Sequence, residues 1–264
     1  MLLLIYLLVG AIAGLLAGLF GIGGGVIVVP ALVFAFTLQG IDPNLLMHMA
    51  VATSLANIVF TALTAIYTHQ KKQAIVWSLA KPVALGMLLG AFIGVNTAIA
   101  LPGHILQAIF GVFVIYLGGK MLLLTQRPAS KQLPNKVVIT ITGTLIGWAS
   151  ALFGIGGGNL LVAWLVNRGV MIKQAVATAA ASGLAIGLVG ATTNILLGQN
   201  IDNLPSYALG YVYLPALLGI LLTSAISAHF GARLAHKMPA KWLQLMFAIL
   251  LILVGIRMLS SFIF

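Results

Sequence analysis

Long apolar stretches, separated by short polar gaps, account for most of the chain. Ten can be distinguished, at residues 2–20, 26–38, 46–67, 75–99, 103–124, 137–153, 159–166, 174–198, 206–228 and 242–264. A helix needs about 20 mainly apolar residues to cross a membrane, so the longer stretches predict membrane-spanning helices. The pattern therefore indicates an all-α polytopic membrane protein.

Two glycine-rich strings interrupt this pattern. The first is Gly18-Leu19-Phe20-Gly21-Ile22-Gly23-Gly24-Gly25, and the second is Ala151-Leu152-Phe153-Gly154-Ile155-Gly156-Gly157-Gly158. A glycine in a helix interior costs about 1 kcal/mol relative to alanine, so four glycines within five residues end a helix. The stretches that follow, 26–38 and 159–166, are too short to cross a bilayer comfortably. We therefore predict that each break is the tip of a re-entrant helical hairpin with a longer first arm and a shorter second arm.

The two halves of the chain also resemble each other outside the glycine strings. Ala50-Val51-Ala52-Thr53 matches Ala175-Val176-Ala177-Thr178, and Pro82-Val83-Ala84-Leu85-Gly86 matches Pro215-Ala216-Leu217-Leu218-Gly219. Such self-similarity predicts an internal two-fold repeat. Repeat 1 covers residues 1–124, a polar linker covers 125–136, and repeat 2 covers 137–264. Each repeat is predicted to contain one hairpin followed by three membrane-spanning helices.

The charges of the loops indicate how the two repeats are related. The second loop after the first hairpin carries Lys71 and Lys72, whereas the corresponding loop of repeat 2 carries Asp202 and no base. Because cytoplasmic loops are rich in Lys and Arg, this bias favours an inverted repeat with both termini outside and a cytoplasmic linker. Arg257, near the outer end of the last helix, is the exception. A parallel repeat of four spans per half, with both termini inside, is the competing arrangement.

The composition excludes a soluble domain. Of the 264 residues, 62% are hydrophobic and 6% are charged, and the mean hydropathy is +1.19. The net charge of +11 comes from lysines and arginines in the polar gaps, so we expect no nucleic-acid partner. No cofactor or metal site is indicated. No histidine lies deep enough in a span to serve an intramembrane protease, so we do not expect an enzyme.

The absence of acids from the predicted spans bears on transport. Asp42 and Asp202, the two acids of the chain, both lie in polar gaps. Carriers coupled to protons commonly relay them through intramembrane carboxylates, so this mechanism is disfavoured. A membrane potential negative inside drives an anion outward by about 2.3 kcal/mol per charge per 100 mV. The pattern thus favours export of an anion over its uptake.

The breaks are the predicted substrate site. A helix N-terminus exposes unpaired N–H groups and about half a positive charge, so two such termini meeting near mid-membrane would bind an anion without a charged side chain. Neutral side chains on the following helices can add hydrogen bonds. The predicted substrate-binding residues are Gly21, Gly23, Gly24, Gly25, Thr53, Ser54, Asn57, Gly154, Gly156, Gly157, Gly158, Asn159, Thr178 and Ser182.

Each of these features also has a structural interpretation. The clustered glycines can serve close helix crossing, and the buried hydroxyls can form ordinary interhelical hydrogen bonds. Glycines spaced every four residues, at Gly10, Gly14 and Gly18 and at Gly86, Gly90 and Gly94, are assigned to packing alone. The five histidines lie at or near loop ends, where we expect interfacial rather than proton-relay roles. They are His48, His69, His104, His229 and His236.

The paired glycine strings, with Ala52-Thr53-Ser54 one helix later, resemble the TauE/SafE family of sulfite and sulfoacetate exporters over nearly the whole chain. The resemblance implies a multi-pass permease of a prokaryotic plasma (inner) membrane, with a lipid bilayer around it and a small sulfur-containing anion as substrate. Ala163 replaces the proline that Pro30 represents in the first copy, and Ala179 replaces Ser54, so the two halves of the site are unequal. A membrane scaffold, or a carrier of another small anion or organic acid coupled to protons through histidine, remains an alternative.

Overall fold

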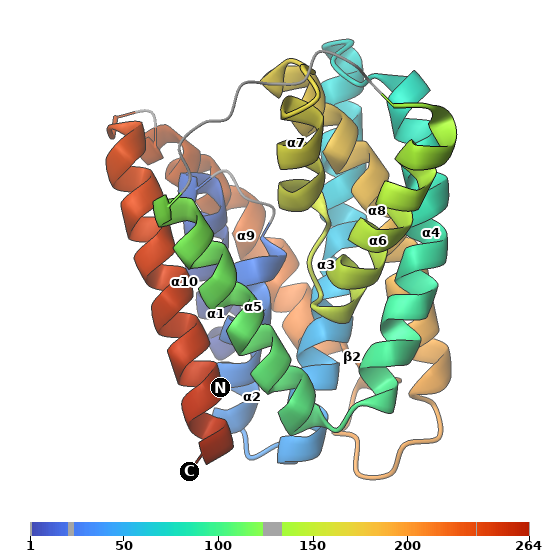
Figure 1. Cartoon of the computed structure of the whole chain (residues 1–264). Helices are drawn as coiled ribbons and strands as arrows, with labels where there is room; N and C mark the ends of the chain where they lie inside the picture. Colours follow the sequence, from blue (N-terminus) through green and yellow to red (C-terminus); the bar gives the residue numbers. More distant parts are fainter. Residues whose placement is uncertain (1, 21–23, 124–133, 236, 264) are drawn as a thin grey trace.

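The computed structural model describes residues 2–20, 24–123, 134–235 and 237–263, and these residues form ten helices and one pair of short strands (Figure 1). The helices are α1 Leu2–Phe20, α2 Gly25–Leu38, α3 Pro43–Lys71, α4 Trp77–Ala100, α5 Gly103–Leu123, α6 Lys136–Leu152, α7 Gly158–Val166, α8 Ile172–Leu197, α9 Leu214–Ala235 and α10 Ala240–Ile263. The strands are β1 Ala208–Leu209 and β2 Val212–Tyr213.

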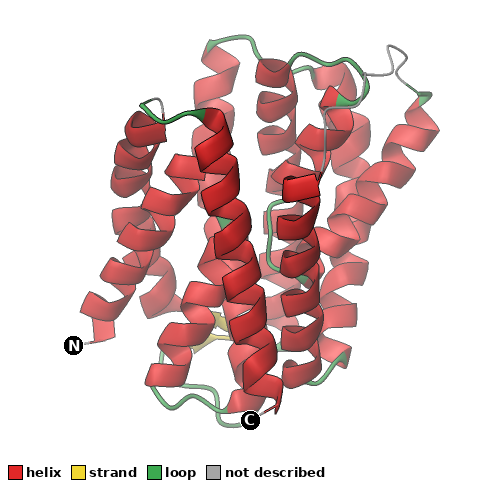
Figure 2. Ribbon diagram, turned by 60° about the vertical axis from the view of Figure 1, so that its left-hand side comes forward, coloured by secondary structure: helices red, strands yellow, loops and turns green. Residues whose placement is uncertain are grey.

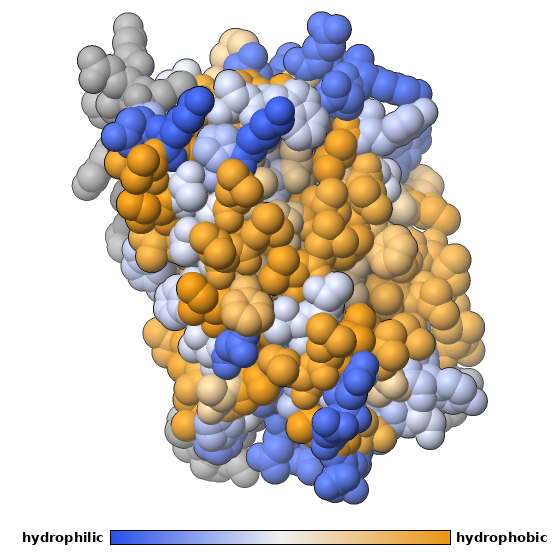
Figure 3. Space-filling model, turned by 90° about the vertical axis from the view of Figure 1, so that its right-hand side faces the viewer, coloured by the Kyte–Doolittle hydropathy of each residue, from blue (hydrophilic) through white to orange (hydrophobic). Residues whose placement is uncertain are grey.

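Six of these helices are long and apolar enough to cross a membrane, namely α3, α4, α5, α8, α9 and α10. Figure 3 shows an apolar band around the middle of one face, with hydrophilic residues gathered toward both ends. The two glycine breaks separate α1 from α2 and α6 from α7. The second arms of these pairs, α2 and α7, are short, with 14 and 9 residues. The prediction of an all-α polytopic membrane protein is therefore confirmed, and the short second arms lie close to where the glycine breaks place them.

Successive helices alternate in direction along the long axis of the molecule (Figure 1), and both termini lie toward the same end (Figures 1 and 2). α3 and α8 occupy the interior, and the share of buried residues in their apolar windows, 61% and 67%, is the highest among the six long helices. They meet at Gly187, where a Cβ atom would lie 3.0 Å from Val59 N. These two central helices are the frame against which the glycine breaks are packed.

Two crossings bring helix backbones into direct contact through glycine. A Cβ atom at Gly86 or Gly90 of α4 would lie only 2.0 Å from the carbonyl oxygen of Thr140 or Thr144 of α6. In the same way, a Cβ atom at Gly18 of α1 would lie 2.1 Å from the Ala228 oxygen of α9. Small residues permit such approaches, so the predicted packing role of both glycine stripes is confirmed.

The segment before α9 differs from the prediction. The apolar stretch 206–228 predicts a helix from its start, but α9 begins only at Leu214, after an antiparallel pair in which Ala208 lies opposite Tyr213. The backbone turns at Tyr207 and Gly210, whose φ angles of 69° and 54° are left-handed. A helix cannot pass through this turn, since left-handed residues do not continue a right-handed helix.

Basic residues gather at the helix ends that lie at one end of the molecule, the upper end in Figure 1. The C-terminal ends of α3, α5, α7 and α9 and the N-terminal ends of α6, α8 and α10 face the upper end of Figure 1. The basic residues at these ends are Lys71, Lys72, Lys120, Lys136, Arg168, Lys173, Arg233, Lys237 and Lys241. Asp42 and Asp202 precede α3 and follow α8, at the opposite end, where Arg257 of α10 also lies.

Candidate functional site

The two glycine breaks meet inside the molecule. Gly25, the first residue of α2, faces the second break so closely that a Cβ atom on it would lie 2.6 Å from Gly154 O and 2.8 Å from Ile155 Cα. Only a residue without a side chain allows this contact. The start of one short helix is thereby set against the chain segment that leads into the other.

In the second break, the backbone leaves α6 at Leu152 and enters α7 at Gly158. Ile155 N donates to Ser150 O at 2.8 Å, which closes the end of α6. Gly154 and Gly157 have φ angles of 66° and 69°, a left-handed conformation that glycine adopts without a steric penalty. These two glycines reverse the chain and aim the first N–H groups of α7 at the break.

A row of N–H groups at the start of α7 has no hydrogen-bond acceptor among the described residues. The first bond of the helix runs from Leu161 N to Gly157 O, and the N-cap, Gly157, supplies no side chain. The N–H groups of Gly156 through Leu160 therefore have no acceptor in the part of the chain that the structure describes. Successive free N–H groups at a left-handed turn and a helix N-terminus form a concavity that favours anions.

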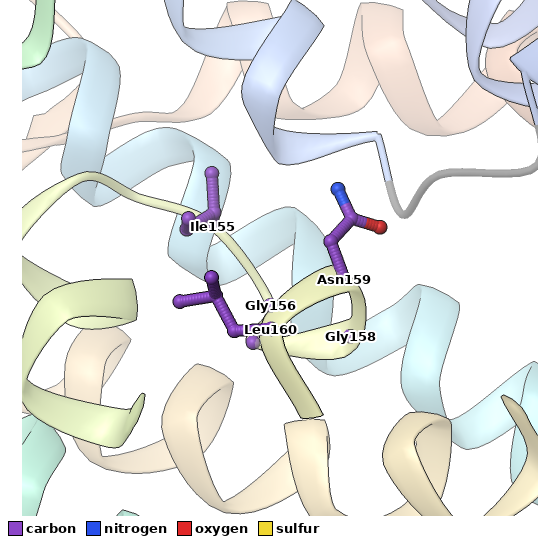
Figure 4. Close-up of a pocket in the computed structure, with 6 residues that line it drawn as sticks. Ile155, Gly156, Gly158, Asn159 and Leu160 are labelled. Carbon is purple, nitrogen blue, oxygen red and sulfur yellow. The ribbon is translucent and has the colours of Figure 1, made fainter. Parts of the chain in front are cut away.

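A small hollow lies at this row. Its lining runs from Ile155 to Leu160, and its cavity volume of about 10 Å³ corresponds to about one water molecule. A Cβ atom at Gly158 would meet no atom of the described residues within 4 Å. Asn159 is half-buried, and Figure 4 shows its amide standing apart from the side chains of Ile155 and Leu160. Asn159 thus adds a polar side chain to the rim of the hollow.

Of the first break, Gly21 and Gly23 lie outside the described residues. Gly24 is the N-cap of α2, and its carbonyl oxygen accepts from Ile27 N at 3.0 Å and Val28 N at 2.8 Å. Gly24 and Gly25 thus stand at the N-terminus of a short helix, the position in which the sequence analysis places them.

The four predicted hydroxyl residues are all buried and all hydrogen-bonded within the protein. Thr53 and Thr178 accept from the backbone N–H groups of Tyr213 and Val76, just before α9 and at the N-cap of α4. Ser182 donates to Thr178 O at 2.9 Å, and Ser54 donates to Gly154 O at 2.7 Å. These hydroxyls hold the site in place, and Ser54 does so by fixing the break itself.

Two polar groups near the second break have no such partner. In the part of the chain that the structure describes, the buried side-chain atoms without a hydrogen bond are Asn57 Oδ1 and Ser150 Oγ. Asn57 of α3 precedes Ile58, whose Cγ2 would lie 3.5 Å from a Cβ atom at Gly156. Ser150 of α6 lies beside Gly157. Asn57 is among the residues predicted from the sequence, whereas Ser150 is not, although its place one turn before Gly154 is a sequence signal.

A family model described as sulfite exporter TauE/SafE matches residues 6–258. The chain belongs to the TauE/SafE family. It is 41% identical to a probable membrane transporter protein of Haemophilus influenzae, with 97% of each chain covered. It is 29% identical to a probable membrane transporter protein of Methanocaldococcus jannaschii over 98% of this chain and 96% of that one. No solved structure matches the chain significantly.

The relatives of this TauE/SafE chain are named as probable membrane transporter proteins, so a substrate site is expected inside the bundle. Among the described residues, no group of three His, Asp or Glu side chains could hold a metal ion. The hollow at the second break is lined by glycine backbone, by the amide of Asn159 and by the apolar residues Ile155 and Leu160, and it has no charged side chain. An arrangement of this kind suits a small anion that is bound by N–H groups.

His48 differs from its predicted interfacial position. It is 7% exposed, its ring nitrogens lie 3.0 Å from Asn44 O and 3.1 Å from the oxygens of Ala98 and Leu101, and its ring stacks on Tyr211. The reason is that the loop between α4 and α5 closes over this turn of α3. His48 therefore ties helix ends together in this TauE/SafE chain, away from the glycine breaks.

Proposed function

We propose that this TauE/SafE chain exports small sulfur-containing anions such as sulfite or organosulfonates across a prokaryotic plasma membrane. The single observation that carries the proposal is the row of N–H groups from Gly156 to Leu160, which have no acceptor among the described residues and follow directly on Gly154 and Ile155, the residues that Gly25 at the start of α2 faces. The three oxygen atoms of a sulfite or sulfonate group are hydrogen-bond acceptors. A row of donors is their complement, and neither ligand requires a charged side chain here.

Electrostatics supports both the binding and the direction. Each helix N-terminus contributes about half a positive charge. Asp42 and Asp202 lie beyond the ends of the helices, so they do not repel an anion at the breaks. With no carboxylate in the described spans to carry protons, the potential of about 2.3 kcal/mol per charge per 100 mV is the simplest driving force. This favours uncoupled outward movement.

The helix pairings support the proposal of an inverted repeat. α1 packs on α9, and α4 packs on α6. If α1 to α5 correspond in order to α6 to α10, then α1 corresponds to α6 and α4 to α9, so the two contacts are equivalent. The hydroxyls of Thr53 and Thr178 likewise accept from the segments that lead into α9 and α4. An odd number of helices in each repeat, together with alternating directions, inverts the second repeat relative to the first.

We propose further that the end carrying the basic residues is cytoplasmic. Lys71 Nζ lies 4.2 Å from the centroid of the Tyr67 ring, and Arg168 Cζ lies 5.3 Å from that of Trp164. Pairs of this kind suit an interface where aromatic rings meet positively charged loops.

Single cysteines test this orientation, because the chain has none of its own. In intact cells, Lys72→Cys should resist a membrane-impermeant thiol reagent until the membrane is opened, whereas Ser206→Cys should react at once. Both side chains are exposed, so burial does not protect either. The reverse pattern would overturn the assigned orientation, and reaction of both from outside would favour a different topology.

Flux in proteoliposomes tests the function. Vesicles loaded with sulfite, sulfoacetate, sulfate or chloride should release sulfite or sulfoacetate faster when the potential is made negative inside, and collapse of a pH gradient should leave the rate unchanged. Asn159→Ala should weaken anion binding about tenfold or more, the value of a hydrogen bond to a charged group. Asn96→Ala is the matched control, because that exposed amide donates to Phe92 O on α4.

Each other outcome has a defined meaning. Flux that depends on the pH gradient would replace uncoupled export with proton coupling and direct attention to the histidines. Flux of none of the four anions by a folded protein would reject the proposed substrates and favour another anion or a scaffold role. Equal flux by Asn159→Ala and Asn96→Ala would remove Asn159 from the site.

A further inference from the structure

Among the described residues, Ser150 carries the one buried side-chain hydroxyl without a hydrogen-bond partner. A serine or threonine inside a helix usually donates to the carbonyl oxygen four residues earlier. Thr144, Ser182 and Ser227 all do so, at distances between 2.8 and 3.1 Å. Ser150 is inside α6 and 0% exposed, yet its Oγ has no hydrogen-bond partner in the described parts of the chain. Its hydroxyl is therefore shielded from water and does not donate to the carbonyl oxygen four residues earlier in α6.

The position of this hydroxyl gives it a role. Ser150 Oγ lies 3.2 Å from the place that a Cβ atom on Gly157 would occupy, beside the left-handed turn from which the unpaired N–H groups start. Ile186 Cδ1 and Met87 Cε approach the same place at 2.8 and 3.4 Å, and both are apolar. The hydroxyl is therefore buried among apolar groups beside the turn at Gly157, where the row of N–H groups without an acceptor among the described residues begins.

We propose that Ser150 is a substrate-binding residue, whose hydroxyl donates a hydrogen bond to an oxygen atom of the oxyanion held by the N–H groups of Gly156 to Leu160. This inference rests on the proposed function and deepens it. The backbone donors would hold the anion from the side of α7, and Ser150 would reach it from α6. Asn57 Oδ1 is the other buried atom without a partner among the described residues. Asn57 lies in α3 next to Ile58, the residue that faces Gly156. The ligand class is a sulfur oxyanion with at least three oxygen atoms.

A substrate-binding role and a structural role predict opposite effects of removing the hydroxyl. A buried hydroxyl without a partner destabilises the ligand-free protein, so Ser150→Ala should unfold at the same temperature or a higher one. Thr144→Val, on the same helix, removes a hydroxyl that donates to Thr140 O, and it should lower the unfolding temperature. In anion binding the order should reverse, with Ser150→Ala weakened about tenfold to a hundredfold and Thr144→Val unchanged.

The experiment is thermal unfolding of the full chain in detergent, with sulfite and sulfoacetate titrated against the wild type and both variants. Weak anion protection of Ser150→Ala, combined with undiminished stability without anion, would support the inference. Equal protection of Ser150→Ala and the wild type would overturn it and leave the proposed function standing. A Ser150→Ala protein that is less stable than the wild type without anion would show a structural hydroxyl and also overturn it. Absence of protection in the wild type would reject the proposed site, and this inference with it.

Discussion

Gly90→Ala is expected to destabilise the folded protein strongly. The added Cβ atom would lie 2.0 Å from Thr144 O and 2.7 Å from Trp148 N, both of which belong to the backbone of α6 and cannot rotate away. α4 would have to move as a unit and would lose the neighbouring contacts at Gly86 and Gly94. Overpacking usually costs about 1–3 kcal/mol, and a rigid backbone places this site at or above the upper limit. A lower unfolding temperature and less monodisperse protein in detergent should result.

Gly119→Ala is the control for Gly90→Ala. Gly119 is in the α5 helix, and a Cβ atom on it would meet nothing within 4 Å, so alanine should be neutral or slightly stabilising there. A Gly90→Ala protein as stable as Gly119→Ala would show that α4 and α6 are farther apart than the structure places them.

Gly158→Leu is expected to abolish anion transport in a protein that still folds. No atom of the described residues lies within 4 Å of the Cβ position, so the first carbon of the new side chain meets none of them. The remaining atoms enter a hollow of about 10 Å³ at the N–H groups of α7 and compete with any anion there. Because each 1.4 kcal/mol of lost binding energy is a factor of ten, a clash of about 3 kcal/mol would reduce binding more than a hundredfold. Flux in proteoliposomes at matched protein density measures this loss.

Gly119→Leu separates a local effect from a general one. It introduces the same side chain at another open glycine position, outside the breaks, and should transport like the wild type. Gly158→Ala should fall between the wild type and Gly158→Leu. Normal flux by Gly158→Leu would mean that the anion passes elsewhere, and the proposal for the second break would fail.

Much of this architecture can be predicted from the sequence, because local composition alone decides it. The runs of apolar residues place nine of the ten helices to within a few residues, and the bunched glycines predict where α6 ends and α7 begins. The spacing of Gly86, Gly90 and Gly94 predicts a face for close packing, since four-residue spacing returns to the same side of a helix. In such cases a residue's neighbours in sequence determine its structure.

Other features depend on contacts between segments far apart in the chain. Nothing local shows that Thr53 accepts from Tyr213, 160 positions away, or that Ser54 reaches Gly154. The pair of strands before α9 lies within an apolar stretch that looks helical in the sequence. Its turn at Gly210 depends on close packing against Ile195 O, which belongs to another part of the chain. Ser150 is an unremarkable helical serine in the sequence, and only its lack of a partner in the folded chain distinguishes it.

The crossing of α1 with α9 also constrains how the protein is made. Thr223 Oγ1 donates to Leu7 O at 2.9 Å, a contact that joins residues 216 positions apart. The ribosome completes α1 long before it synthesises α9, which packs on the glycine face of α1. Until α9 has been made, that face must contact lipid or α2 in the bilayer. Contacts at such sequence separation form late, because a long loop must close first. The first helix to be synthesised is therefore expected to be among the last to reach its final packing.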